Sequence, residues 1–146
     1  PAAARWRELA RVARSTMVLG DFDAPDEFPR GGPIPVPLAA DAPMRREWVV
    51  VCDAPDLSAC LAAWELPGQG DVPDPHRIFE SVWTVDHRAV RDAARVCART
   101  AQEAGISEAQ GLLYELADEP SGSVADIAGA TTLMNRVVAY VDRFSH

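Results

Sequence analysis

The segment from Arg46 to Pro55, REWVVVCDAP, decides the fold. Its centre, Trp48 to Cys52 (WVVVC), is apolar at every position, so both faces of an extended chain are apolar here. Two apolar faces are typical of a strand that is buried between two layers. We therefore predict that this segment is the central strand of a sheet with helices packed on it.

The residues that follow predict a strand-helix-strand unit. Residues 53–56 (DAPD) supply capping side chains and an early proline, which are features of a helix start. Residues 57–64 have one apolar helical face, made of Leu57, Cys60, Leu61 and Trp64. Residues 78–85 (IFESVWTV) predict the second strand. If the two strands pair in parallel, the crossover is right-handed.

The chain before this unit predicts a helix, a strand and a long excursion. Residues 2–14 have apolar side chains at helical spacing, and residues 16–22 (TMVLGDF) favour a strand. From residue 23 to 46, six prolines and two glycines exclude a helix or a central strand. Residues 33–37 (PIPVP) favour polyproline II or an edge strand. An excursion of this length either covers a pocket or packs as a structural loop.

The C-terminal half predicts three helices. Asp86 is the expected N-cap of a helix that runs to about Ala104, with Gly105 just past its end. Its apolar stripe consists of Val90, Ala93, Ala94, Cys97, Ala101 and Ala104. Ser107 is expected to cap a shorter helix over 107–117, whose core residues are Leu112, Leu113 and Leu116.

The last predicted helix, residues 123–144, has two adjacent apolar stripes. One contains Val124, Ile127, Ala128, Thr131, Met134, Val138 and Val141, and the other contains Ala130, Leu133, Val137, Tyr140 and Phe144. So wide an apolar face indicates either a central helix or a helix that meets a partner subunit. We predict a homodimer through this helix as one of these two alternatives.

Composition limits the class of protein. The chain has 146 residues and 48% hydrophobic content, enough for one domain with a sizeable core. Its net charge of -8 argues against direct nucleic-acid binding and against anionic membrane surfaces. No apolar run reaches the roughly 18 residues of a spanning helix, and residues 1–13 lack the apolar region of a signal peptide. We expect a single soluble, cytoplasmic domain over residues 1–146.

Motifs of catalysis and metal binding are missing from the sequence. It contains no phosphate-binding loop, dinucleotide fingerprint, nucleophile elbow or paired CxxC. The three histidines, His76, His87 and His146, are too scattered to indicate a metal site. The three cysteines are widely spaced in apolar segments and are expected to be buried free thiols, although a Cys52 nucleophile paired with a histidine is conceivable. We expect a protein that is not an enzyme.

Two groups of residues are candidate binding sites. Tryptophans on the strands and helices can converge on one sheet face and line a pocket with acidic groups beside it, or they can simply pack the core. The candidate ligand-binding residues are Trp48, Trp83, Glu47, Phe22, Asp53 and Glu80. A row of arginines, Arg88, Arg91 and Arg95, lies along one side of the long helix and is either an anion-binding site or a solvated, self-paired surface.

Several blocks of the sequence together resemble a known family. They are Arg5–Ala10 (RWRELA), Val18–Phe22 (VLGDF), Arg46–Pro55, Phe79–Val85, Val90–Cys97 and Asn135–Tyr140. This series resembles the DICT sensory domain of actinobacterial MerR-like transcription regulators. The resemblance implies a domain that senses a ligand or signal and passes it to a DNA-binding or other output domain. It also implies that the chain lacks the N-terminal part of that domain and its DNA-binding domain.

These observations give one expected architecture and one leading function. The fold class is α/β, a small mixed sheet of about three to five strands with a strand-helix-strand unit and a helical C-terminal half packed on it. A small-molecule effector held near Trp48, Trp83 and the 23–46 excursion shifts an equilibrium between two conformations, and the last helix transmits that shift. The alternatives are a protein-protein interaction or dimerisation module without a ligand, and a small hydrolase or transferase.

Overall fold

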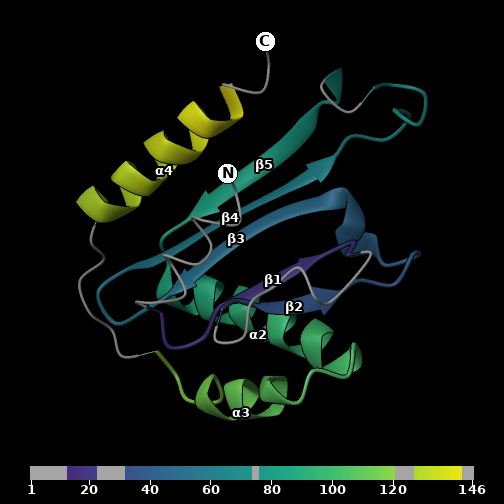
Figure 1. Cartoon of the computed structure of the whole chain (residues 1–146). Coiled ribbons are helices and arrows are strands. Elements are labelled where there is room, and N and C mark those ends of the chain that lie inside the picture. Colours follow the sequence, from purple (N-terminus) through teal and green to yellow (C-terminus); the bar gives the residue numbers. More distant parts are fainter. Residues whose placement is uncertain (1–12, 23–31, 74–75, 121–126, 143–146) are drawn as a thin grey trace. The chain divides into compact units, whose positions relative to one another are not determined.

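The computed structural model describes residues 13–22, 32–73, 76–120 and 127–142. The chain divides into two compact units. Unit 1 consists of Pro1–Arg45 and Val96–Ala117, and unit 2 consists of Arg46–Arg95 and Asp118–His146. Helix α2 (His87–Glu103) contributes to both units because the boundary lies within it. Figure 1 shows the elements along the chain.

Three antiparallel strands form the sheet of unit 2 (Figure 1). They are β3 (Glu47–Asp53), β4 (Ser58–Glu65) and β5 (Phe79–Thr84), in the order β3-β4-β5. The central strand is therefore β4, in which the first four residues are buried. The prediction that Trp48–Cys52 is central is wrong, because β3 lies at the edge of its sheet and Trp48 is 56% exposed. Its valines are half-buried, so apolar side chains on both faces do not distinguish an edge strand from a central one.

The segment 57–64, predicted to be a helix, is strand β4. Pro55 and Asp56 form a two-residue turn, across which Ala54 and Leu57 exchange backbone hydrogen bonds of 3.1 and 3.3 Å. Proline favours the first central position of such turns, so the residues that resemble a helix start instead close a hairpin. The predicted strand-helix-strand unit with its parallel crossover is therefore wrong, whereas the strand predicted over 78–85 is confirmed as β5.

Unit 1 contains a second, parallel pair of strands, β1 (Met17–Gly20) and β2 (Ile34–Pro37). They confirm the strand predicted within 16–22, and of the two alternatives for 33–37, polyproline II or an edge strand, they bear out the strand. Backbone N–H groups of Ile34 and Leu38 donate to Thr16 and Gly20 carbonyls at 2.8 and 2.9 Å. Pro35 and Pro37 fall on the alternate positions of β2, which face away from β1 in an extended strand, so their missing N–H groups remove no bond to β1.

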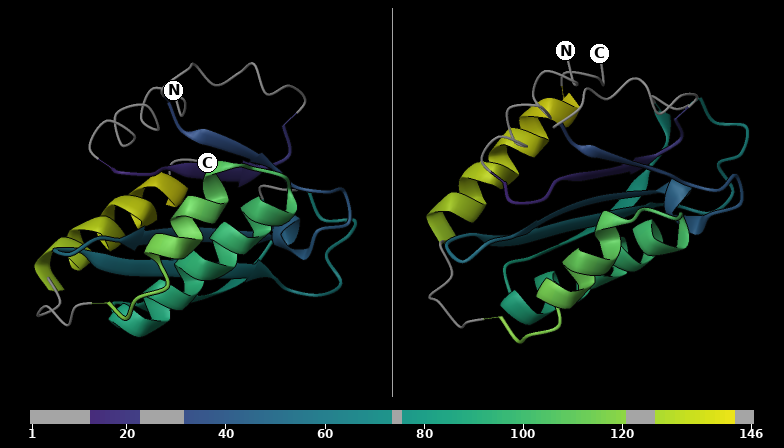
Figure 2. Two further views of the ribbon diagram at one scale, coloured as in Figure 1. Left: turned by 90° about the horizontal axis from the view of Figure 1, so that it is seen from below. Right: turned by 60° about the horizontal axis from the view of Figure 1, so that its bottom comes forward.

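The core of unit 1 joins these strands to two helices. Val36, Ala101 and Ala109 are fully buried, and Met17, Leu19 and Ile106 pack against them. Ala109 belongs to α3 (Glu108–Glu115), which runs beside α2 (Figures 1 and 2). Of the helix predicted over 2–14, only Ala13 and Arg14 are described, and they form a bend. Residues 23–31 of the excursion also lie outside the described residues.

The ends of α2 confirm their predicted caps. Asp86 Oδ1 accepts a hydrogen bond of 2.9 Å from the Ala89 N–H. At the other end Gly105 has a φ of +82°, and the Gly105 and Ile106 N–H groups donate to Gln102 and Ala101 carbonyls at 2.9 and 3.0 Å. This is the Schellman pattern. Ala104 is exposed, so the predicted apolar stripe ends earlier, at Ala101.

The two later helices agree in part with their predictions. Ser107 occupies the predicted N-cap position of α3, but its side chain does not cap the helix: its backbone is helical and its Oγ donates to Glu108 Oε2 at 2.8 Å. Leu116 is buried and Leu112 and Leu113 are half-buried, as predicted.

The last helix, α4 (Ile127–Asp142), begins within the predicted range. Ala130 is 2% exposed and Ile127 is 69% exposed. Residues 123–126, 143 and 144, and the side chains of residues 137, 138, 140 and 141, lie outside the part of the chain that the structure describes. Among the described helices, none is long and apolar enough to cross a membrane. The predicted mixed α/β class is confirmed, with the strands divided between two small sheets.

Candidate functional site

The sheet of unit 2 separates most of the predicted ligand-binding residues. Glu47 and Glu80 both pair with Trp64, one on each neighbouring strand. Directly opposed residues of antiparallel strands lie on the same face. Trp48 and Trp83 pair with Ala63 and Leu61, so they lie on the opposite face from the two glutamates.

The remaining predicted residues are also placed apart. Trp48 and Trp83 share a face but lie on the two edge strands. Trp64 Nε1 donates to Glu80 Oε2 at 3.2 Å, so that carboxylate already has a partner. Phe22 belongs to unit 1, where its ring lies over Gly20: a Cβ added at Gly20 would come within 3.2 Å of Phe22 Cζ. Binding near Trp48 and Trp83 stays a prediction.

A polar cluster does form where Asp53 meets the start of α2. Arg91 Nε lies 2.5 Å from Asp53 Oδ2, and Arg91 Nη2 lies 3.3 Å from Asp53 Oδ1. The remaining Arg91 nitrogen, Nη1, donates to the Asp118 carbonyl at 2.7 Å. The two side chains are only 16% and 10% exposed. This geometry is a bidentate, buried ion pair that ties β3, α2 and the 118–120 segment together.

Ser58 and His87 lie beside this ion pair. His87 Nδ1 is 2.8 Å from Ser58 Oγ. Both residues line a small pocket of about 70 Å³, together with Asp53, Ala54, Pro55, Arg91 and Pro120. That volume suits about two water molecules and is far below the roughly 300 Å³ of small-molecule sites. The carboxylate that would orient the imidazole in a catalytic triad, Asp53, is held by Arg91 instead.

The row of arginines on α2 already faces carboxylates. Arg88 is 3.7 Å from Glu119 in an exposed pair, Arg91 pairs with Asp53, and Arg95 Nη1 donates to Asp92 at 2.9 Å. This arrangement favours the self-paired alternative for Arg88, Arg91 and Arg95. Their binding of an anion stays a prediction.

Two of the three cysteines have unreactive surroundings. Burial, with a further contribution from the charge of Asp53, raises the pKa of Cys52, and burial raises the pKa of Cys60. Only the thiolate is nucleophilic. At about pH 8, we therefore expect iodoacetamide to alkylate both cysteines several-fold more slowly in the folded protein than in urea.

The sign of this effect follows from the direction of the shift. Because the folded pKa of each thiol is raised, the thiolate is suppressed most at pH values below that pKa, and the difference shrinks as pH rises through it. Peptide mass spectrometry of Cys52 and Cys60 measures the two rates. Equal rates in the folded and unfolded protein would contradict this view of the thiols.

The larger pocket lies in unit 1 and has a volume of about 430 Å³. One wall is a single face of α3, made of Glu108, Gly111, Leu112 and Glu115. The other wall comes from residues 13–16, Gly32 and Ile34. A Cβ added at Gly111 would meet nothing within 4 Å, so this glycine opens the middle of the helical wall. Gly32 and Ile34, which belong to the proline-rich excursion, line this pocket, and the two interpretations of the excursion as a whole stay predictions.

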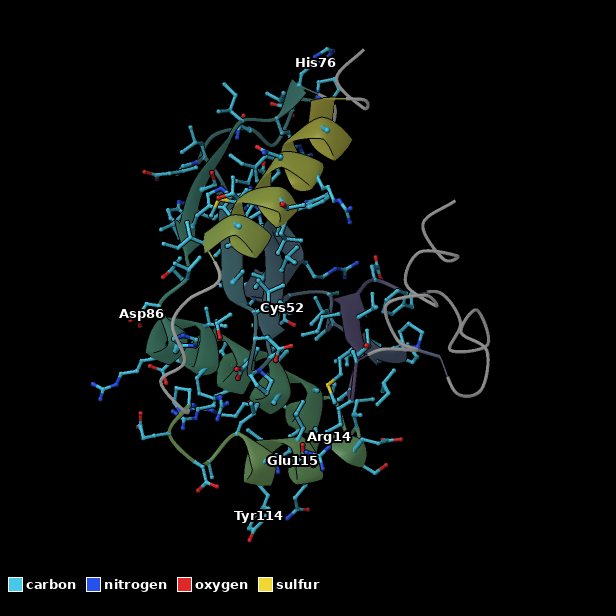
Figure 3. The ribbon with its side chains drawn as sticks, turned by 90° about the vertical axis from the view of Figure 1, so that its left-hand side faces the viewer. Arg14, Cys52, His76, Asp86, Tyr114 and Glu115 are labelled. Atoms are coloured by element: carbon cyan, nitrogen blue, oxygen red, sulfur yellow. The ribbon has the colours of Figure 1, made fainter. Side chains whose placement is uncertain are left out.

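Charged groups lie at both ends of the α3 wall. Arg14 Nη1 is 3.7 Å from Glu115 Oε2, and the Arg14 side chain is 86% exposed. Figure 3 shows these two side chains close together, with Tyr114 of the same helix pointing outward. At the other end, the hydrogen bond from the Ser107 side chain, and then that from its own backbone N–H, lower the pKa of Glu108. Glu108 therefore remains a carboxylate across the physiological range.

Sequence reasoning missed this pocket. Residues 108, 111, 112 and 115 follow the helical spacing i, i+3, i+4 and i+7, which places them on one face. The sequence pattern instead predicts that Leu112 of this face, with Leu113 and Leu116, lies in the core of the domain. Among the described residues, no group of three or more metal-ligating side chains occurs that could hold a metal ion.

Comparison with protein families matches the N-terminal part of the chain. Residues 1–66 match the DICT family, described as "Sensory domain in DIguanylate Cyclases and Two-component system". The matched range contains strands β1 to β4. It also contains the wall of the larger pocket that faces α3. Comparisons with curated proteins and with solved structures gave no match.

Proposed function

We propose that this chain is the signal-sensing domain of a bacterial transcription regulator, and that the pocket along α3 binds its small-molecule effector. The observation that carries the proposal is the pocket itself. Its volume of about 430 Å³ lies within the usual range for small-molecule sites. The sensory description of the family matched by residues 1–66 supports the same interpretation.

The proposed mechanism is a population shift. An effector between α3 and the 13–16 segment binds two conformations unequally and so favours one of them. In this proposal α4, which follows α3 in the chain, passes the shift to a homodimer partner or to an attached DNA-binding domain. The net charge of -8 supports DNA contact through the attached domain rather than through this segment. A cytoplasmic location follows from this role and belongs to the proposal.

Binding, rather than catalysis, is the proposed activity of the site. The α3 wall presents carboxylates, a glycine and a leucine, and no nucleophile paired with a base. In the second, smaller pocket, Ser58 is 4% exposed and Asp53 is engaged by Arg91. Both observations support a binding domain.

The direct test fills the pocket with a side chain. Gly111→Leu places an isobutyl group into the open middle of the wall, and leucine also favours the helix more than glycine does. Native mass spectrometry follows exposure of the protein to the small-molecule fraction of a bacterial extract. We expect the original chain to retain a small molecule and Gly111→Leu to lose it.

The control for this experiment lies on the same helix. Gln110→Leu adds the same side chain at an exposed position that does not line the pocket. It should retain the small molecule. Equal retention by Gly111→Leu, or no retention by the original chain, would contradict the proposal.

A protein-protein interaction module without a ligand is the second candidate function. A group of large apolar side chains at and before β5 supports it, with exposures of 62% for Ile78, 38% for Phe79 and 52% for Val82. This candidate predicts that the chain self-associates without retaining any small molecule. Analytical ultracentrifugation of the original chain and of Val82→Glu distinguishes the two candidates, because only an interface on β5 is weakened by that charge.

A further inference from the structure

The α3 wall of the larger pocket has a regular charge pattern. Glu108 and Glu115 are seven residues apart, which separates them by about 10 Å along a helix that rises 1.5 Å per residue. Between them the wall is formed by Gly111 and Leu112. The wall therefore has a carboxylate at each end and an open apolar surface between the two.

Among the described residues, the opposite wall offsets this negative charge only in part. It consists of residues 13–16, Gly32 and Ile34, and Arg14 is the single basic residue among those that line the pocket in the described part of the chain. The Arg14 guanidinium lies 3.7 Å from Glu115 and is largely in solvent. Exposed pairs of this kind contribute little free energy, so another cation can replace Arg14 at Glu115.

The protonation state of Glu108 favours a cationic ligand. Its carboxylate accepts a hydrogen bond from Ser107 and has a lowered pKa, so it presents a full negative charge to the pocket. The guanidinium of Arg14 already lies against Glu115. The second carboxylate of the wall therefore pairs with a cationic group.

We propose that the pocket binds a linear organic polycation of the polyamine class, with an ammonium group at each end of a chain made mostly of methylene groups. One ammonium lies at Glu108, the chain passes over Gly111 and Leu112, and the other ammonium replaces Arg14 at Glu115. This inference rests on the proposed function, because it names the class of effector for the same pocket.

The test is isothermal titration of the full chain with spermidine. Glu108→Gln and Glu115→Gln should each weaken binding about tenfold, and Gly111→Leu should abolish it. Glu119→Gln is the matched control, since it removes the same charge from an exposed position outside the pocket, and it should leave the affinity unchanged. Arg14→Ala should strengthen binding a few-fold because it removes the competing cation.

Three further probes define the ligand class. Putrescine, whose shorter chain reaches one carboxylate at a time, should bind more weakly than spermidine. Octanediol lacks the charges and suberate reverses them, so neither should bind. Equal binding of octanediol, preferential binding of suberate, or an equal effect of Glu119→Gln would overturn the assignment. Circular dichroism melting confirms that each variant is folded.

Failure of this inference is distinguishable from failure of the proposed function. If spermidine does not bind, yet the original chain retains a molecule from the extract that Gly111→Leu loses, the cation assignment is overturned and the pocket remains an effector site. If neither occurs, both are overturned.

Discussion

Replacing Arg91 with methionine is expected to lower the free energy of unfolding by about 3 kcal/mol. The substitution removes the guanidinium that binds both oxygens of Asp53 and the carbonyl of Asp118. The Asp53 side chain is 10% exposed, so its carboxylate would remain largely buried without its partner. Urea unfolding followed by circular dichroism measures the change.

Two companion variants separate the buried pair from arginine in general. Arg88→Met removes the same group from an exposed pair with Glu119 and should change the free energy of unfolding by about 0.5 kcal/mol or less. The double variant Asp53→Leu with Arg91→Met should be more stable than Arg91→Met alone, because it leaves no unpaired charge. Equal losses for Arg88→Met and Arg91→Met would contradict the buried ion pair.

Replacing Leu61 with alanine is the second substitution expected to have a large effect, a loss of about 3 kcal/mol. Leu61 is 8% exposed on the central strand β4, where it pairs with Val50 on one side and Trp83 on the other. Removing its side chain leaves a gap on that face of the sheet between the side chains of Val50 and Trp83. Urea unfolding again provides the measurement.

The control for Leu61 lies on the neighbouring strand. Val82→Ala removes an apolar side chain that is 52% exposed, and the expected loss is about 0.5 kcal/mol or less. If Leu61→Ala is no more destabilising than Val82→Ala, then β4 is not the central strand of unit 2.

The elements predicted correctly are those with local signals. Asp86 and Gly105 define the ends of α2 through contacts within a few residues, so the sequence alone reveals them. The alternating prolines of β2 likewise restrict the backbone wherever the segment lies. Helix caps and turns depend on contacts between residues only a few positions apart in the sequence. Such contacts can be predicted from a sequence pattern.

The error at 57–64 shows where local signals fail. Small residues such as Ala59 and Ala63 favour a helix in isolation, but here they fill the crowded centre of a sheet. Pro55 and Asp56 suit either a helix start or a hairpin turn. The pairing of β4 with β3 and β5 decides between them, and this pairing is a tertiary effect.

The candidate site was harder to predict for the same reason. Adjacent residues of a strand lie on opposite faces, but whether Trp48 shares a face with Trp83, and Glu47 with Glu80, depends on the strand register, which the sequence does not state. The α3 face was visible as a spacing of 108, 111, 112 and 115. The sequence does not show that Arg14 and Ile34, from distant parts of the chain, lie opposite this face and complete the pocket.

Hydrogen-deuterium exchange tests the central claim, that the α3 pocket is the effector site of a sensory domain. The full chain is compared with and without the small-molecule fraction of a bacterial extract, and Gly111→Leu is treated in the same way. The account predicts slower exchange in α3 and in residues 13–16 and 32–34 of the original chain, and no change in Gly111→Leu. Slower exchange confined to β3 and β5 around Trp48 and Trp83, or no change anywhere, would contradict it.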